Sequence, residues 1–388
     1  MFIRKFLLFV ALVLSTSLHA NTLLVEKQKF IIDDFKTFNG KTIKQVNVGW
    51  EAYGKLNADK SNAILITHYF TGNSHAAGKY TESDPLPGYW DSIVGPGKAI
   101  DTNKFYVISS DTLVNASAFD KNVITTGPAS IDPDTGKPYG LSFPVVTIRD
   151  FVEVQKALID SLGIQKLHAV IGPSMGSMQS LEWAIAYPDM VERMVSVIGT
   201  GEADAWLVAG LEKWAAPIKQ DPKWKGGNYY DGEAPVRGLQ LSLATITQEA
   251  MHPDIFNMSN PAHKNIDEKV LNDINANFPV VDWLYNAAGM RTSTMDANHI
   301  LYLVRACQLF VAGHNNDFAG SLAKVKAKTL FLPATKDLLL YPAMSKKVHQ
   351  ALGERSQYQE IGGAWGHLDG LFSIHTKANV LTSFLEAE

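Results

Sequence analysis

Short, continuous apolar runs alternate with amphipathic stretches along most of the chain, a pattern typical of buried parallel strands separated by helices. Strands are predicted at residues 23–30, 43–53, 63–67, 105–110, 167–171, 194–198, 329–333 and 357–361. Helices are predicted at residues 147–162, 178–186, 342–352 and 376–385. The first two strands flank the turn signal Asn39-Gly40 and are expected to pair antiparallel. The pattern predicts an α/β protein with a mostly parallel central sheet flanked by helices.

The stretch between the predicted strands at 167–171 and 194–198 carries the strongest candidate chemistry. It turns through Gly172-Pro173-Ser174-Met175-Gly176 into an amphipathic helix that Pro188 ends. Strand, tight turn, helix and strand is the context in which Gly-x-Ser-x-Gly forms a nucleophile elbow, whereas the same pattern elsewhere is an ordinary glycine-rich turn. We interpret Ser174 as the nucleophile. The N–H of Met175, at the start of the helix, is then a donor for the oxyanion.

An acid and a histidine follow the next-to-last and the last predicted strands. Asp337 comes after the strand at 329–333, and His367 lies in the glycine-rich loop after the strand at 357–361. Ser, Asp, His is the chain order of the α/β-hydrolase fold. His367 would take the proton from Ser174, and Asp337 would hold the imidazole in place. The loop after the strand at 63–67 supplies the second oxyanion donor in such enzymes, here the N–H of Phe70.

A long segment without strand–helix alternation interrupts the pattern. Residues 201–326 are rich in helical spacing, tryptophan and tyrosine, and we interpret them as a helical lid inserted into the α/β core. The aromatic residues are expected to form lid core rather than a substrate box. The predicted organisation is a signal peptide at 1–20, an α/β-hydrolase core at 21–200 and 327–388, and the lid at 201–326.

Residues 111–146 form a long stretch rich in glycine, proline and aspartate, expected to be irregular and to form a wall of the active site. Within it, Asp132-x-Asp134-x-Gly136 resembles the start of a calcium-binding loop. The later ligands of such a loop are missing from the sequence. We therefore expect a plain turn there and no metal.

The N-terminal residues indicate export. Arg4 and Lys5 precede an apolar run and a small-polar stretch that ends at Ala20, which is the layout of a secretory signal peptide. We expect cleavage after Ala20 and a periplasmic or secreted protein without a stable membrane span; an uncleaved anchor is the alternative. The net charge of −4 gives no basic excess, so no nucleic-acid partner is expected. The single cysteine, Cys307, lies in an apolar helical run and is interpreted as a buried structural thiol.

Over residues 48–386 the chain resembles the homoserine O-acetyltransferase family of α/β-hydrolases. The segments that carry the resemblance are WEAYGKLN at 50–57, HYFTGNSH at 68–75, YWD at 89–91, GPGKAIDT at 95–102, TGP at 126–128, DTGKPYG at 134–140, VTIRD at 146–150, SMG at 174–176, EWA at 182–184 and DAN at 296–298. The resemblance implies an acyl-serine mechanism, with Asp337 and His367 as the acid–histidine pair. It also implies that a homodimer can form through the lids. No cofactor is expected.

Departures from the family's pattern bear on the substrate. Members that acylate homoserine carry an arginine just after the strand that here ends near Thr200, to pair with the carboxylate of the amino acid. This chain has the acids Glu202 and Asp204 there, which would repel a carboxylate. Those members also place an acid directly after the catalytic histidine. The candidate substrate-pocket residues are therefore Tyr69, Glu202, Trp206, Leu368 and Asp369.

Three functions are open on the sequence. Hydrolysis of small carboxylic esters is favoured, because water is always available and an exported enzyme would meet little acetyl-CoA or homoserine. Transfer of an acyl group from acetyl-CoA to homoserine or another acceptor would use the same catalytic residues. The third is an inactive, binding-only relative, which the presence of all three triad residues disfavours. The expected partner is a small-molecule ester or acyl donor.

Overall fold

The computed structural model describes residues 23–260 and 266–387. Within this part of the chain an eight-stranded sheet runs in the order β1-β2-β6-β3-β7-β8-β9-β10. The strands are β1 (Gln28–Lys36), β2 (Thr42–Tyr53), β3 (Ala63–Thr67), β6 (Tyr106–Ser110), β7 (Ala169–Pro173), β8 (Arg193–Val197), β9 (Lys328–Leu332) and β10 (Ser356–Tyr358). Strand β2 pairs antiparallel with β1 and β6, and every pairing from β6 to β10 is parallel. The predicted α/β-hydrolase fold with a mostly parallel sheet is confirmed.

The first strand is the one strand prediction that misplaces an element. The apolar residues 23–25 do not join the sheet; Val25 instead donates its N–H to the carbonyl of Lys79, 2.9 Å away. The sheet begins at Gln28 and runs through Asp33-Asp34 to Lys36, mostly facing solvent. A strand at the edge of a sheet buries little apolar surface, so many of its residues are polar. A search for apolar runs therefore does not detect it.

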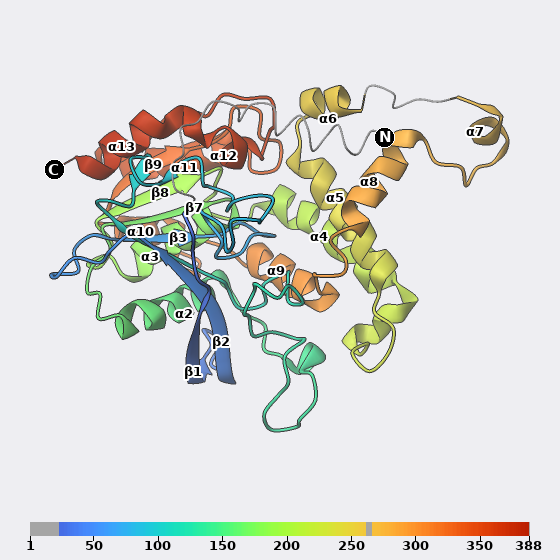
Figure 1. Cartoon of the computed structure of the whole chain (residues 1–388), viewed down its shortest axis with the longest axis horizontal. Helices are drawn as coiled ribbons and strands as arrows, with labels where there is room; N and C mark the ends of the chain where they lie inside the picture. The colour runs from blue at the N-terminus through green and yellow to red at the C-terminus, as the bar shows by residue number, and fades with distance from the viewer. Residues whose placement is uncertain (1–22, 261–265, 388) are drawn as a thin grey trace.

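Successive side chains along each strand point to opposite faces of the sheet, and each face carries one apolar cluster. Leu65 and Val170 belong to one cluster, together with helices α2 (Ile148–Ser161), α3 (Met175–Ala186) and α11 (Pro342–Leu352). Ile64 and Ile171 belong to the other, which α13 (Ala378–Glu386) covers. Figure 1 shows α12 (Asp369–Phe372) and α13 on one side of the sheet and α2 on the opposite side. The sheet is therefore the middle of three layers.

Helix α3 is buried on every side rather than amphipathic as predicted. Its polar side chains find partners inside the protein. Gln179 bonds to Gln155 of α2 over 2.7 Å, and Glu182 accepts the N–H of Gly313 over 2.8 Å. Arg149 forms an ion pair with Glu182. Because α2 and residue 313 cover the outer face, polar groups there are satisfied internally rather than by water.

The segment between β8 and β9 is helical; in Figure 1 α4 to α9 lie to one side of the sheet, whereas α10 lies against the core. Its helices are α4 (Ala205–Gln220), α5 (Val236–Ala250), α6 (Pro253–Ser259), α7 (Glu268–Asn272), α8 (Pro279–Gly289), α9 (Ala297–Gln308) and α10 (Phe318–Ala323). Where this segment leaves and rejoins the core, its two ends are hydrogen-bonded. Ala203 donates to the carbonyl of Phe310 over 2.8 Å, and Ala312 donates to that of Gly201 over 2.9 Å.

Three smaller expectations can be compared with the structure. Residues 111–146 contain little regular structure, with one 3₁₀ turn at Gly140–Ser142. In the Asp-rich turn, Asp134 pairs with Lys44 at 2.6 Å, and the described residues contain no group of three metal-ligating side chains. Cys307 is buried, which raises the pKa of its thiol to about 12.

The predicted signal peptide lies outside the described residues. In the part of the chain that is described, no helix has both the length and the apolar character needed to cross a bilayer. Cleavage after Ala20 and export therefore stay predictions.

Candidate active site

Ser174 sits in the tight turn between β7 and α3, with φ of 57° and ψ of −120°. This is a strained conformation for a residue with a side chain, and the packing around the turn has to enforce it. Gly172 and Gly176 show how tight that packing is. A Cβ at Gly172 would lie 2.2 Å from the carbonyl oxygen of Gly176, and one at Gly176 would lie 2.1 Å from that of Thr67. Both positions need glycine, and the turn has the geometry of a nucleophile elbow.

Ser174, His367 and Asp337 form one hydrogen-bonded line, and all three are buried. His367 Nε2 lies 2.7 Å from Ser174 Oγ, and His367 Nδ1 lies 2.7 Å from Asp337 Oδ2. The other oxygen, Asp337 Oδ1, accepts the backbone N–H groups of Leu339 and Leu340 at 2.8 and 2.9 Å. An ionised carboxylate only accepts, so Nδ1 carries the proton and Nε2 is free to accept the Ser174 hydroxyl. The imidazole is thus oriented to deprotonate the serine.

The two predicted oxyanion donors border this line. Met175 is the first residue of α3, and Phe70 follows β3 in the sheet, whose neighbour is β7. Among the hydrogen bonds of the described residues, none has the N–H of Phe70 or Met175 as its donor. The ring of Phe70 packs edge-on against Trp214 of α4, with centroids 5.1 Å apart. Both N–H groups are therefore available to a ligand.

The predicted pocket residues divide into two groups. Tyr69 precedes Phe70, is largely buried and meets the ring of Tyr89 edge-on at 5.2 Å. Leu368 directly follows His367 and precedes α12. Asp369 is buried and accepts the N–H of Trp365 and the hydroxyl of Ser373 at 3.2 and 2.6 Å, so it holds the His367 loop instead of facing a substrate.

Glu202 and Trp206 form no hydrogen bond or ion pair with the triad among the described contacts. Glu202 pairs with Lys347 of α11 and lines a cavity of about 190 Å³ whose described lining residues include none of the three triad residues. Trp206 is 72% exposed in the first turn of α4. The chain after β8 contacts α11 before it enters the helical segment: Ser345 of α11 donates its hydroxyl to the carbonyl of Gly199 over 2.7 Å.

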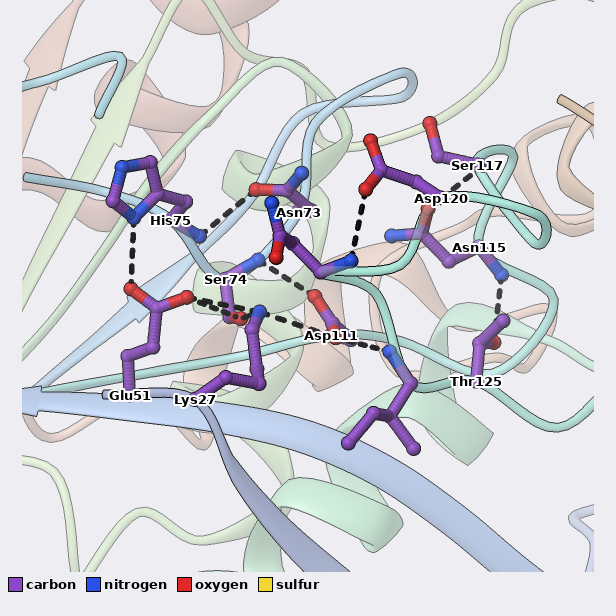
Figure 2. Close-up of polar contacts among 12 residues, drawn as sticks. Lys27, Glu51, Asn73, Ser74, His75, Asp111, Asn115, Ser117, Asp120 and Thr125 are labelled. Carbon is purple, nitrogen blue, oxygen red and sulfur yellow. Dashed lines mark hydrogen bonds and ion pairs between the residues drawn. The ribbon is translucent and has the colours of Figure 1, made fainter. Parts of the chain in front are cut away.

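A buried charged network under the 68–78 loop was not predicted (Figure 2). Glu51 of β2 is fully buried; it pairs with Lys27 at 2.9 Å and with His75 at 3.0 Å. The hydroxyls of Tyr53 and Tyr80 donate to it at 2.9 and 2.7 Å. Burial alone would raise the pKa of Glu51, but the bond from His75, the charge of Lys27 and the Tyr80 hydroxyl lower it to about 2. Glu51 is therefore ionised at neutral pH.

A second buried carboxylate, Asp111, ties the same loop to the core. Its Oδ1 accepts the N–H of Ser74 at 2.7 Å, and its Oδ2 accepts the N–H of Ile124 at 3.0 Å. Asn115 donates to the carbonyl of Gly72 over 2.9 Å, closer to Phe70. The loop that carries the Phe70 N–H is held at several points, as an oxyanion donor requires. The only feature of the sequence that could have indicated this network was an acidic residue, Glu51, inside an apolar predicted strand.

Comparisons with known proteins agree with this geometry. A family model described as the alpha/beta hydrolase fold matches residues 104–372. Homoserine O-acetyltransferase of Methanococcoides burtonii is 40% identical over 342 residues, which cover 86% of this chain and 68% of that protein.

Two solved structures superpose closely on the chain. The crystal structure of esterase E22 is 59% identical, covers 94% of this chain and all of that one, and gives a TM-score of 0.92. Homoserine O-acetyltransferase from Bacillus anthracis is 36% identical, covers 94% of this chain and 99% of that one, and gives a TM-score of 0.91. Proteins with two different activities in their titles are thus similar to this chain over nearly its whole length.

Proposed function

The chain belongs to the homoserine O-acetyltransferase family of α/β-hydrolases, and we propose that it is an exported serine esterase for small carboxylic esters. The observation that carries the proposal is the line Ser174–His367–Asp337, with spacings of 2.7 Å, beside two unengaged N–H groups. That arrangement supports acyl transfer through an acyl-serine. The acceptor of the acyl group is the finer part of the proposal.

In the proposed mechanism, Ser174 Oγ attacks the ester carbonyl carbon while His367 Nε2 takes its proton. The N–H groups of Phe70 and Met175 receive the negative charge that develops on the carbonyl oxygen. When the tetrahedral intermediate collapses, the C–O bond to the alcohol breaks and His367 returns the proton to the leaving oxygen. Asp337 stays ionised and stabilises the imidazolium.

Deacylation repeats these steps with water in place of serine. Water attacks the acyl-serine carbonyl, and His367 takes a proton from it. The C–O bond to Ser174 then breaks, the serine oxygen regains the proton, and the carboxylic acid leaves. Each group has returned to its starting state, and an ester plus water has become an acid plus an alcohol.

Water is favoured as acceptor because the position expected to bind the carboxylate of homoserine is acidic and already occupied. Glu202 pairs with Lys347, and Asp204 accepts the hydroxyl of Tyr341 at 2.7 Å and the N–H of Leu207 at 2.8 Å. No cation is left unengaged there among the residues that these contacts involve. The 59% identity to a protein titled an esterase supports the same choice.

Acyl transfer from acetyl-CoA to homoserine is the second candidate. It is favoured by the relatives at 35–40% identity that are named homoserine O-acetyltransferase. Both candidate functions use the same triad, so the test must show whether water or homoserine accepts the acyl group. One assay measures hydrolysis of 4-nitrophenyl acetate and butyrate, and the other measures homoserine-dependent release of CoA from acetyl-CoA.

The decisive variant is Ser174→Ala, and Ser180→Ala on the same buried helix is the matched control. For an esterase, hydrolysis falls by at least about 10⁴-fold in Ser174→Ala, stays within a few-fold of wild type in Ser180→Ala, and no homoserine-dependent CoA release is seen. Homoserine-dependent CoA release well above ester hydrolysis would replace the esterase proposal with the transferase. Ester hydrolysis that survives in Ser174→Ala would rule out the proposed nucleophile.

Export and a homodimer through the lid belong to the same proposal. Expression of the full chain in a Gram-negative host should give periplasmic protein that begins at Asn21; cytoplasmic protein that retains residue 1 would contradict export. Large exposed apolar side chains on the lid, among them Met258, Leu271, Ile274 and Met290, support the dimer. Light scattering should give twice the monomer mass, and an Ile274→Asp variant should shift it toward the monomer.

A further inference from the structure

Arg291 lies in the turn between α8 and α9 and reaches into the lid. Its Nη2 donates to the carbonyl of Leu243 at 3.0 Å and to the hydroxyl of Thr247 at 2.5 Å, both on α5. Among the ion pairs of the described residues, none includes Arg291. Its Nε and Nη1 likewise have no acceptor in the described hydrogen bonds. The guanidinium therefore contacts only neutral oxygens.

Arg291 is partly buried, and charges removed from water in this way are normally paired. Burial lowers the pKa of Arg291, yet a guanidinium stays protonated in proteins. The positive charge is therefore present and uncompensated. A ligand that brings a negative charge would recover the energy lost when the guanidinium was removed from water.

A chain of contacts connects Arg291 to the loop that carries His367. Thr247, which it binds, lies one helical turn before Met251, and Met251 pairs in a β-bridge with Gly366, the neighbour of His367. On the other side, Arg291 acts on the phenol of Tyr69, where its charge opposes the rise in pKa that burial causes. Tyr69 precedes the oxyanion donor Phe70. The guanidinium is thus bound to the helix whose end pairs with the His367 loop, and its charge reaches the residue that precedes Phe70.

We propose that Arg291 binds a carboxylate of the substrate, so that the preferred esters carry a free carboxylate on their acyl or alcohol part. The proposal rests on the proposed esterase function and names its substrate class. Two nitrogens of one planar fork match the two oxygens of a carboxylate. A phosphate dianion would call for a second cation, and the described hydrogen bonds of Arg291 involve none.

The test compares charged with neutral esters in Arg291→Met, Arg291→Lys and the control Arg237→Met. Arg237 lies on α5, in the same lid, and stacks over Tyr285 at 4.6 Å. Mono-4-nitrophenyl succinate carries the carboxylate on the acyl side, and 4-acetoxybenzoate carries it on the alcohol side. 4-Nitrophenyl butyrate and methyl 4-acetoxybenzoate are their neutral partners.

For one of the two charged esters, kcat/KM should fall about 10- to 100-fold in Arg291→Met, mainly through KM, while the neutral partner changes less than about threefold. Arg291→Lys should restore part of the loss, because it keeps the charge but not the fork. Arg237→Met should behave as wild type. An equal fall for charged and neutral esters would mean that Arg291 only ties the α8–α9 turn to α5, and would overturn the proposal. Charged esters that are no better than neutral ones in the wild-type protein would also overturn it.

Binding to Ser174→Ala protein separates this inference from the proposed function. Calorimetry with monomethyl succinate needs no turnover, and should show binding that is absent for dimethyl succinate and in the Ser174→Ala, Arg291→Met double variant. If that binding is seen while the wild-type protein hydrolyses no ester, the carboxylate site stands and the esterase proposal fails. If esters are hydrolysed but neither succinate nor acetoxybenzoate discriminates the variants, the esterase stands and the carboxylate site fails.

Discussion

Two cationic side chains, Lys27 beneath the loop that carries the Phe70 donor and Arg291 in the lid, have opposite surroundings. Lys27 contacts two fully buried carboxylates, Glu51 at 2.9 Å and Asp111 at 3.5 Å. Arg291, on the lid side, contacts a carbonyl and a hydroxyl and has no ion pair among the described residues. The first cation is matched by negative charge inside the protein. The second is matched by none.

The difference suggests that Lys27 holds the loop backbone in place, whereas Arg291 binds a ligand. The network around Lys27 fixes backbone: Ser74, which binds Asp111 through its N–H and Glu51 through its hydroxyl, lies four residues after Phe70. Its charged groups are bonded to one another and to the loop, so Lys27 has its partners inside the protein. Arg291 retains its charge, and its Nε and Nη1 have no acceptor among the described hydrogen bonds, so an anion can bind there. The two cations should therefore respond in opposite ways to removal.

The largest effect is expected for Lys27→Met. It leaves Glu51 and Asp111 buried with less compensating charge, and breaking a buried charge cluster costs about 3–5 kcal/mol. Urea unfolding should show this loss of stability, and ester hydrolysis should fall with it because the 68–78 loop loosens. Lys29→Met, an exposed position two residues further along β1, is the control and should change stability by less than about 0.5 kcal/mol. A Lys27→Met protein as stable as Lys29→Met would mean that the network does not support the fold.

Acid unfolding tests the carboxylate half of the network. The pKa of Glu51 is about 2 in the folded protein, against 4.5 for the unperturbed group, so its stabilising effect is present above pH 4.5 and is lost as the pH falls toward 2. The shift corresponds to about 3 kcal/mol at neutral pH. Glu51→Gln should be destabilised by roughly this amount at pH 7 and should lose less further stability than wild type between pH 4.5 and 2. The exposed Glu26→Gln should retain the wild-type slope; if Glu51→Gln retains it too, the pKa of Glu51 is not depressed.

The smallest effect on stability is expected for Arg291→Met. Replacing a partly buried charge that has no ion pair by an apolar side chain of similar length removes a desolvation cost along with two hydrogen bonds, so the net change should stay within about 1 kcal/mol. Urea unfolding of Arg291→Met and Lys27→Met under the same conditions measures the contrast directly. If Arg291→Met lowers the free energy of unfolding by more than about 3 kcal/mol, both cations stabilise the fold and the contrast between them fails.

The sequence predicted those features whose residues lie close together along the chain. The bounds of β3 and α11 were predicted to the residue, because β3 is an uninterrupted buried run and Pro342 marks the first turn of its helix. The turn at Ser174 also lies within a few residues of its strand and helix. Asp337 and His367 could be found because each follows a strand whose position in the sheet was predictable.

The two cations could not be found in that way. Lys27, Glu51 and Asp111 come from segments far apart in the chain, and their meeting depends on β2 lying beside β6 and on residues 23–27 leaving the sheet. Arg291 follows a helix that no periodicity distinguishes from its neighbours, and a lone arginine in a turn is usually solvated. Glu202 and Trp206 were chosen by their place after a strand, a signal that does not predict the ion pair of Glu202 with Lys347 or the exposure of Trp206.

The hydrogen-bonded junction at residues 201–203 and 310–312 has a consequence for how such enzymes can diverge. The chain departs and returns at one point, so closing this junction depends only weakly on how long the intervening segment is. Exchange of the segment between codons 203 and 310, with one crossover at each end, would bring in a different set of helices, Arg291 included, and leave the codons for Ser174, Asp337 and His367 untouched. Substrate preference and catalytic chemistry can thus be inherited separately.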